Sequence, residues 1–128
     1  MPIAAVLLTL VLCYLFGSIS IARLAARILA PGVDLEQVSL PDRSTGGTFT
    51  LKNTGATTAS VLLGPRVGGM IGLLDIVKGL LPCLAARLLF PEQSLYLWAG
   101  VATVAGHIWP VYHRFRGGGG LSPALGVF

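Results

Sequence analysis

The stretch from residue 106 to residue 126, "GHIWPVYHRFRGGGGLSPALG", decides how this chain is interpreted. An apolar segment leads into it, and within a few residues the chain becomes basic and then runs through four consecutive glycines. Glycine tolerates positive φ and lets a backbone approach a ligand closely. Successive amides can therefore face an anion, with the charges of Arg114 and Arg116 beside them. Composition leaves a second interpretation equally open, a flexible basic linker that touches lipid headgroups.

The composition of the chain around this stretch indicates a membrane protein. Of its 128 residues, 54% are hydrophobic and 11% are charged, whereas a soluble domain has about 25% charged residues. So few charges cannot coat the surface of a small globule. The net charge of +4 comes without a basic cluster that alternates with aromatics, so we expect no nucleic acid and favour an anionic membrane face or phosphorylated substrates. Cys13 and Cys83 lie in apolar runs without metal spacing, so we expect no metal and no disulfide framework.

Three segments have the length of membrane spans, at about residues 3–28, 67–90 and 94–112. The first has no charged side chain before Arg23 and is too long for a signal-peptide core, so we interpret it as a retained helix. Residues 31–53 predict an irregular loop. Residues 53–65 are too short to span and predict a half-helix in the membrane or an interfacial helix.

These segments predict an all-α membrane protein. We expect one domain over residues 1–128, a helical transmembrane bundle with at least three spanning helices and irregular or re-entrant cytoplasmic motif loops. Residues 121–128 begin a further apolar helix that is not completed, so we expect the chain to lack a C-terminal part of the domain.

The distribution of basic residues predicts the orientation. Most bases flank the loops that follow the first and third spans: Arg23, Arg27, Arg43, Lys52, Arg66, Arg114 and Arg116. The turn between the second and third spans carries Glu92 and no base, although Arg87 lies one turn before it. Because short basic loops stay inside, we expect these two loops to be cytoplasmic, the N-terminus to be outside, and the membrane to be the plasma membrane.

Polar side chains inside the predicted spans are candidates for a functional site. Asp75 and Lys78 are three residues apart and share a helix face, so they can form an ion pair. Ionisable residues within a span are costly and point to function, but a purely structural pair is an equally open interpretation. His107, at the end of the third span, is either a helix-end hydrogen-bonding group or a group that acts on substrate.

Four segments together resemble one known family, the integral-membrane acyl-phosphate:glycerol-3-phosphate acyltransferases (the PlsY family). These segments are "YLFGSIS" at residues 14–20, "NTGATTASVLLG" at 53–64, "LLDIVKG" at 73–79 and "GHIWPVYHRFRGGGG" at 106–120. They resemble, in order, the family's first-helix motif, its Asn-x-Gly-Ala-Thr loop, its Asp-x-x-Lys-Gly helix and its glycine-rich loop. Residues 39–51 resemble an insertion.

The resemblance implies an enzyme of phospholipid biosynthesis. Members of the family move a fatty acyl group from acyl-phosphate to the 1-position of glycerol 3-phosphate, without a cofactor and without an acyl-enzyme intermediate. It implies glycerol 3-phosphate, acyl-phosphate and membrane lipids as partners, and His107 and Asn53 as catalytic residues. The substrate-binding residues that it implies are Lys52, Gly55, Thr57, Arg114, Arg116, Gly117, Gly118, Gly119 and Gly120.

Departures from the family pattern leave an alternative open. The family's loop lysine falls on Gly119, a family arginine falls on Val61, and the segment Thr50, Leu51, Lys52 stands in place of Gly-Ser-Gly. Lys52, Arg114 and Arg116 are candidates to replace the lost donors. The alternative is a catalytically silent paralogue that acts as a membrane binding or regulatory protein. A small transport or scaffold protein is a third interpretation, indicated by the Asp75–Lys78 pair.

Overall fold

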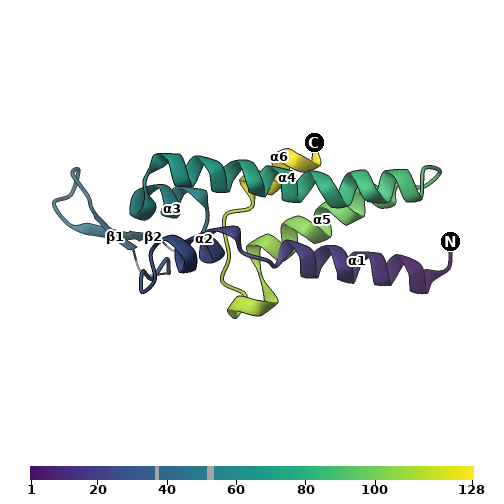
Figure 1. Cartoon of the computed structure of the whole chain (residues 1–128), viewed down its shortest axis with the longest axis horizontal. Helices are drawn as coiled ribbons and strands as arrows, with labels where there is room; N and C mark the ends of the chain where they lie inside the picture. The colour runs from purple at the N-terminus through teal and green to yellow at the C-terminus, as the bar shows by residue number, and fades with distance from the viewer. Residues whose placement is uncertain (37, 52–53) are drawn as a thin grey trace.

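A computed structural model describes residues 1–36, 38–51 and 54–128 and is mostly helical (Figure 1). The elements follow one another as α1 (Ile3–Gly17), α2 (Ile21–Leu29), β1 (Val38–Pro41), β2 (Thr48–Leu51), α3 (Ala56–Leu63), α4 (Pro65–Leu89), α5 (Leu95–Ile108), the 3₁₀ turn η1 (Val111–His113) and α6 (Leu121–Val127). The mostly helical fold that the apolar pattern predicts is confirmed.

The first apolar segment is divided into two helices. Ser18 Oγ donates to the Tyr14 carbonyl oxygen at 2.9 Å, and Ser20 is the N-cap of α2, where its hydroxyl accepts from the Arg23 amide at 3.3 Å. Serine offers the backbone partners that compete with a continuous helix. The prediction of one uninterrupted helix over residues 3–28 is therefore wrong at residues 18–20, and Figure 1 shows α1 and α2 as separate helices joined by a short segment.

Within the described residues, two segments are long and apolar enough to cross a membrane, Ile3–Leu29 and Pro65–Leu89. The second is α4, whose 25 residues extend for about 37 Å at 1.5 Å per residue. The third predicted span, residues 94–112, is shorter than expected, because α5 has 14 residues and ends at Ile108, two residues before Pro110. The presence of at least three spanning helices stays a prediction.

Small residues let the long helices approach one another closely. A Cβ at Gly106 of α5 would collide with the Tyr14 carbonyl oxygen of α1, and one at Gly17 would collide with the Thr103 backbone. The two buried apolar clusters consist mostly of small side chains. One contains Ala22, Ala26, Leu35, Ala59 and Ile71, and the other contains Cys13, Ala86 and Ala99. Small residues at helix crossings are typical of membrane bundles, and much of the outer surface is apolar, including Leu7, Leu8 and Leu88.

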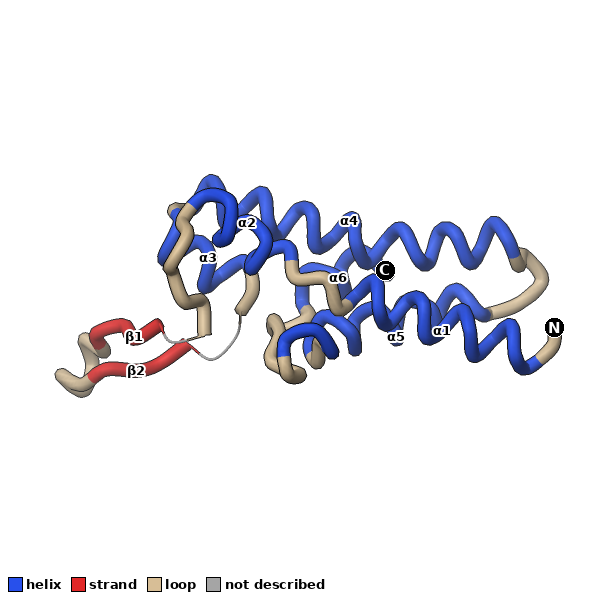
Figure 2. The backbone as a smooth tube through the Cα atoms, turned by 60° about the horizontal axis from the view of Figure 1, so that its bottom comes forward, coloured by secondary structure: helices blue, strands red, loops and turns tan. Residues whose placement is uncertain are grey.

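The segment predicted as an irregular loop contains a β-hairpin. β1 and β2 pair antiparallel, from Val38 opposite Leu51 to Pro41 opposite Thr48. The Asp42 carboxylate closes the turn, since it accepts from the Ser44 amide at 2.9 Å and the Thr45 hydroxyl at 2.8 Å. The hairpin projects from the end of the molecule opposite the N-terminus (Figures 1 and 2). The prediction of irregular structure is therefore wrong for residues 38–51.

Candidate active site

A pocket of about 230 Å³ lies where the two glycine-containing motif loops meet. We call it the motif pocket. Its lining comes from the end of β2, the first turn of α3, α4, α5 and the start of α6: Leu51, Gly55, Ala56, Thr57, Thr58, Asp75, His107, Gly119, Gly120, Leu121 and Ser122. Segments that are up to about seventy residues apart in sequence thus share one cavity.

Backbone contacts hold the two motif loops against each other. The Thr54 amide donates to the Gly117 carbonyl oxygen at 3.1 Å, and a Cβ at Gly55 would lie 3.6 Å from Gly118 Cα. Gly55 is the N-cap of α3, so the first residues of that helix, Ala56 and Thr57, face the cavity. The amino end of a helix carries free amides and a partial positive charge, which favour a negatively charged group.

A buried polar cluster forms one wall of the motif pocket. Lys78 Nζ lies 3.2 Å from Asp75 Oδ1 and 3.0 Å from His107 Nδ1, and it donates to the Ile19 carbonyl oxygen at 2.9 Å. The side chains of Asp75, Lys78 and His107 are all buried. Ile19 lies in the interruption between α1 and α2, so this interruption supplies a backbone acceptor to a buried cation. Buried charges need partners of this kind.

Gly118 packs directly against the imidazole of His107. Its amide donates to the His107 carbonyl oxygen at 3.2 Å, and a Cβ at this position would collide with His107 Nε2. The second glycine of the loop is therefore required by packing against the imidazole. Because Lys78 occupies Nδ1, Nε2 is the ring nitrogen on the glycine-loop side.

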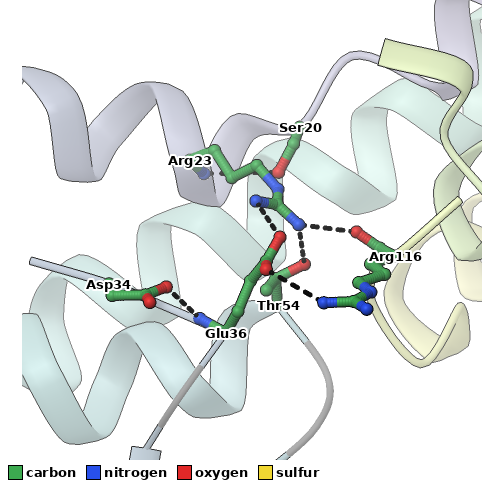
Figure 3. A network of polar contacts seen from close by, with 6 residues as sticks. All are labelled: Ser20, Arg23, Asp34, Glu36, Thr54 and Arg116. Atoms are coloured by element: carbon green, nitrogen blue, oxygen red, sulfur yellow. Dashed lines mark hydrogen bonds and ion pairs between the residues drawn. The ribbon is translucent and has the colours of Figure 1, made fainter. Parts of the chain in front are cut away.

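Arg23 of α2 contacts both motif loops without lining the motif pocket (Figure 3). Its guanidinium lies 2.8 Å from Glu36 Oε1, donates to the Arg116 carbonyl oxygen at 2.6 Å and contacts Thr54 Oγ1 at 3.4 Å. Glu36 also lies 3.6 Å from the Arg116 guanidinium. Hydrogen bonding from Arg23 holds the pKa of the Glu36 carboxyl below its ordinary value. Arg23 is therefore a positioning residue for both loops.

The structure gathers some of the predicted site residues and leaves others apart. Five of the predicted residues line the motif pocket: Gly55, Thr57, His107, Gly119 and Gly120. Gly117 and Gly118 do not line it but form backbone hydrogen bonds with Thr54 and His107. Arg114 and Arg116 are exposed and do not line it, and the Arg116 guanidinium faces Glu36. Lys52 and Asn53 lie outside the described residues. The substrate-binding role of Lys52, Arg114 and Arg116 and the catalytic role of Asn53 stay predictions.

Sequence reasoning missed Arg23 and Glu36. Arg23 counted only as one of several loop bases, because a basic residue at a helix end is typical of any cytoplasmic membrane interface. Its i,i+3 relation to the N-cap Ser20 was the available local signal, but its contacts to Thr54 and Arg116 span 31 and 93 residues of sequence. Such pairing depends on the tertiary fold.

The described lining of the motif pocket contains neutral polar groups and the carboxyl group of Asp75. Within the described residues, no group of three or more His, Cys, Asp or Glu side chains could hold a metal ion. The described lining also contains no Arg or Lys. The buried cation Lys78 contacts two of the lining residues, Asp75 and His107. The cavity instead offers polar side chains (Thr57, Thr58, Ser122 and His107) and the backbone amides at the start of α3 and in the glycine loop.

The geometry agrees with the comparison with known proteins. A family model described as glycerol-3-phosphate acyltransferase matches residues 7–128. The chain belongs to this family. Among the relatives named glycerol-3-phosphate acyltransferase, the one from Prochlorococcus marinus (strain NATL1A) is 38% identical over 122 residues, and the one from Myxococcus xanthus (strain DK1622) is 41% identical over 115 residues. These matches cover 95% and 89% of this chain and 56% and 54% of the relatives, so the chain spans about half their length.

Solved structures of PlsY (YgiH), an integral membrane glycerol 3-phosphate acyltransferase, have the same fold. The glycerol 3-phosphate form matches with a TM-score of 0.76 at 35% identity, over 96% of this chain and 56% of that one. The lysophosphatidic acid form matches with a TM-score of 0.74 at 34% identity, over 96% and 55%. Together with its apolar helices, this likeness supports a location in the membrane. Leucines of α1 and α4 are exposed on the surface of the described chain.

Proposed function

We propose that this chain forms the phosphate-holding part of an acyltransferase that moves a fatty acyl group from acyl-phosphate to the 1-hydroxyl of glycerol 3-phosphate. In this reaction the hydroxyl oxygen bonds to the acyl carbon, the bond from that carbon to the phosphate oxygen breaks, and the hydroxyl proton leaves with the phosphate. The products are lysophosphatidate and inorganic phosphate. The observation that carries the proposal is the motif pocket, in which both motif loops meet over His107. The names of the relatives and the two ligand forms of PlsY support it.

His107 has a defined role in this proposal. A Lys78 ammonium that donates to Nδ1 leaves the ring proton on Nε2, because neutral imidazole has one donor and one acceptor nitrogen. The Nε2–H group then acts as a hydrogen-bond donor to a phosphate oxygen or to the charge that develops on the carbonyl oxygen. Asp75 holds the ammonium in place.

An apolar surface next to the site suits the acyl chain. Two hollows of about 210 and 320 Å³ lie between α1 and α4, and Phe16 and Leu81 line both of them. The smaller hollow reaches Lys78, and the larger extends to Ala85. From Leu74 to Ala85, α4 rises by about 16 Å. An acyl chain along this surface would have its phosphorylated end near the buried cluster.

Substitution at Gly119 tests the proposal, because this residue lines the motif pocket, and the resemblance of the glycine-rich segment places the family's loop lysine at this position. Gly119→Lys places an ammonium at the cavity, and a charge-assisted contact contributes about 1.5–3 kcal/mol. We expect lysophosphatidate formation by the purified chain in detergent to rise at least about tenfold. Gly69→Lys, at an exposed α4 glycine with open space around it, is the matched control and should change nothing.

The same experiment separates the acyltransferase from a catalytically silent paralogue. The lack of an Arg or Lys in the described lining of the motif pocket is the observation that favours the silent form. If neither the wild-type chain nor Gly119→Lys forms lysophosphatidate or binds glycerol 3-phosphate, the acyltransferase proposal is wrong for this chain. Binding without turnover in both proteins would identify a binding protein that keeps the phosphate site.

A further inference from the structure

A second pocket, of about 220 Å³, lies between α2 and η1. We call it the α2–η1 pocket. Its lining residues differ from those of the motif pocket, so it is a separate site. Its polar lining includes Arg23, Arg27 and His113, which face it from α2 and from the turn that follows α5.

The charge of the α2–η1 pocket is not balanced. Glu36 pairs with Arg23, but no described carboxylate forms an ion pair with the exposed Arg27. His113 is half-buried, and burial together with the neighbouring Arg23 and Arg27 guanidinium groups lowers the pKa of its imidazole, against a smaller opposing effect of Glu36. The two guanidinium groups in the lining, from Arg23 and Arg27, give the pocket more positive than negative charge. The pocket therefore favours an anion.

Besides Ser20, the remaining lining of the pocket is largely apolar and accessible. Ile19, Leu24 and Tyr112 line it and have 44%, 51% and 58% of their surface exposed. They lie where α1 ends and α2 begins and just beyond the end of α5, which is the polar end of the apolar helices. A ligand that fills this pocket meets positive charge on one side and exposed apolar side chains on the other.

We propose that the α2–η1 pocket binds the phosphate headgroup of an anionic phospholipid, with Arg27 and His113 contacting the phosphate and Ile19, Leu24 and Tyr112 contacting the upper part of the lipid. Arginine at a membrane surface attracts anionic lipids, and its planar fork matches phosphate oxygens. The apolar wall selects a lipid over free phosphate, because a soluble anion gains nothing from Leu24. The site is independent of acyl transfer and exists whether or not the chain is active.

Titration of the purified chain with a short-chain phosphatidylglycerol tests the site, with the ring signals of His113 followed by NMR. We expect saturable shifts of the His113 signals, much weaker shifts with phosphatidylcholine and none with inorganic phosphate at the same concentrations. Arg27→Gln should weaken binding about fivefold to tenfold. Leu24→Ala, which removes an exposed apolar wall residue, should weaken it as well.

Arg66→Gln is the matched control, because it removes the same charge from an exposed residue outside the pocket. It should leave the lipid affinity within about twofold of the wild type. Equal weakening by Arg66→Gln and Arg27→Gln would overturn the proposal in favour of general surface charge. Binding of inorganic phosphate as tight as that of the lipid would overturn it in favour of a free-phosphate site, and unmoved His113 signals would exclude the pocket altogether.

Discussion

Arg23 illustrates how one side chain holds loops that are distant in sequence. It comes from α2 and reaches Glu36, Thr54 and the Arg116 carbonyl oxygen, so it fixes the starts of both motif loops without lining the motif pocket. A lysine would keep the charge but lose the fork that serves three partners at once. The position therefore depends on the shape of the guanidinium as well as on its charge.

We predict that Arg23→Lys loosens both loops while the helices stay folded. We expect faster hydrogen exchange at the Thr54 and Gly118 amides, which donate to the carbonyl oxygens of Gly117 and His107. Loss of charge-assisted hydrogen bonds costs about 1.5–3 kcal/mol each, so exchange should accelerate at least about tenfold. Arg27→Lys, one turn further along α2, is the control. Unchanged exchange at both amides in Arg23→Lys would show that Arg23 does not position the loops.

The buried pair of Asp75 and Lys78 gives a second prediction at this scale. Removal of one partner leaves a buried charge unpaired, which costs about 3–5 kcal/mol. Asp75→Ala and Lys78→Ala should each lower the free energy of unfolding by this order. The double variant should lose clearly less than the sum of the two. Unfolding in detergent mixtures, followed by circular dichroism, measures all three, and additive losses would argue against the ion pair.

At the residue scale, the sequence predicted contacts between residues that are close together in the chain. The i,i+3 spacing of Asp75 and Lys78 predicted a shared helix face, and the structure places their charged groups 3.2 Å apart. The contact of Lys78 with His107, 29 residues away, was not predictable. It depends on how α4 packs against α5, and spacing within one helix says nothing about this packing.

At the level of elements, the close crossing of α1 and α5 is set by glycine. Gly106→Ala places a methyl group against the Tyr14 carbonyl oxygen, and we expect a loss of about 1–3 kcal/mol from overpacking. Gly69→Ala is the control in α4, where nothing lies within 4 Å of the new Cβ. It should be neutral or should stabilise the chain by up to about 1 kcal/mol. A Gly106→Ala variant as stable as Gly69→Ala would contradict the crossing.

The turn of the hairpin gives a pH prediction. Hydrogen bonds from Ser44 and Thr45 lower the pKa of Asp42 from 3.8 to about 2. Because the folded pKa is below the ordinary value, the carboxylate stabilises the turn fully above about pH 4. This contribution is lost as the pH falls through about 2. NMR titration of the Asp42 carboxyl carbon should show this midpoint, and the Ser44 amide should lose protection over the same range.

A control variant and a contrary result define that test. Asp42→Asn has no carboxyl group to titrate, so protection of the Ser44 amide should no longer change with pH in this range. An Asp42 midpoint at its ordinary value would mean that the hydroxyl and amide groups of Ser44 and Thr45 do not hold the carboxylate, and that the turn forms for other reasons.

Element boundaries were the part of the fold that sequence patterns predicted least well. The apolar pattern of residues 3–28 continues across Ser18 and Ser20, yet their hydrogen bonds to the backbone end one helix and start the next. Hydropathy averages over a window and does not register such caps. The hairpin was missed for a related reason: its strands have four residues each, and its polar turn dominates the composition of the segment.

At the level of the whole molecule, the polar features gather at one end. The hairpin, α2 and α3 lie toward the end away from the N-terminus, the loop between α5 and α6 lies near the middle of the long axis, and the α4–α5 turn lies near the N-terminus (Figure 1). We therefore expect both proposed phosphate sites to face the side of the membrane on which the basic loops lie. A soluble phosphorylated substrate and an anionic lipid headgroup would both approach from that side, and the apolar helices extend away from it into the bilayer.

This arrangement predicts the topology in cells. Arg43, Glu92 and Arg116 are all exposed, so a cysteine at each position can react with a thiol reagent. Short basic loops stay in the cytoplasm, so cysteines at 43 and 116 should be protected from a membrane-impermeant reagent in intact cells, and a cysteine at 92 should be labelled.

The native Cys13 and Cys83 are buried, and both are replaced by alanine to remove background labelling. After permeabilisation all three positions should react equally, which shows that protection came from the membrane. Labelling of 43 and 116 with protection of 92 in intact cells would reverse the orientation and place both phosphate sites outside.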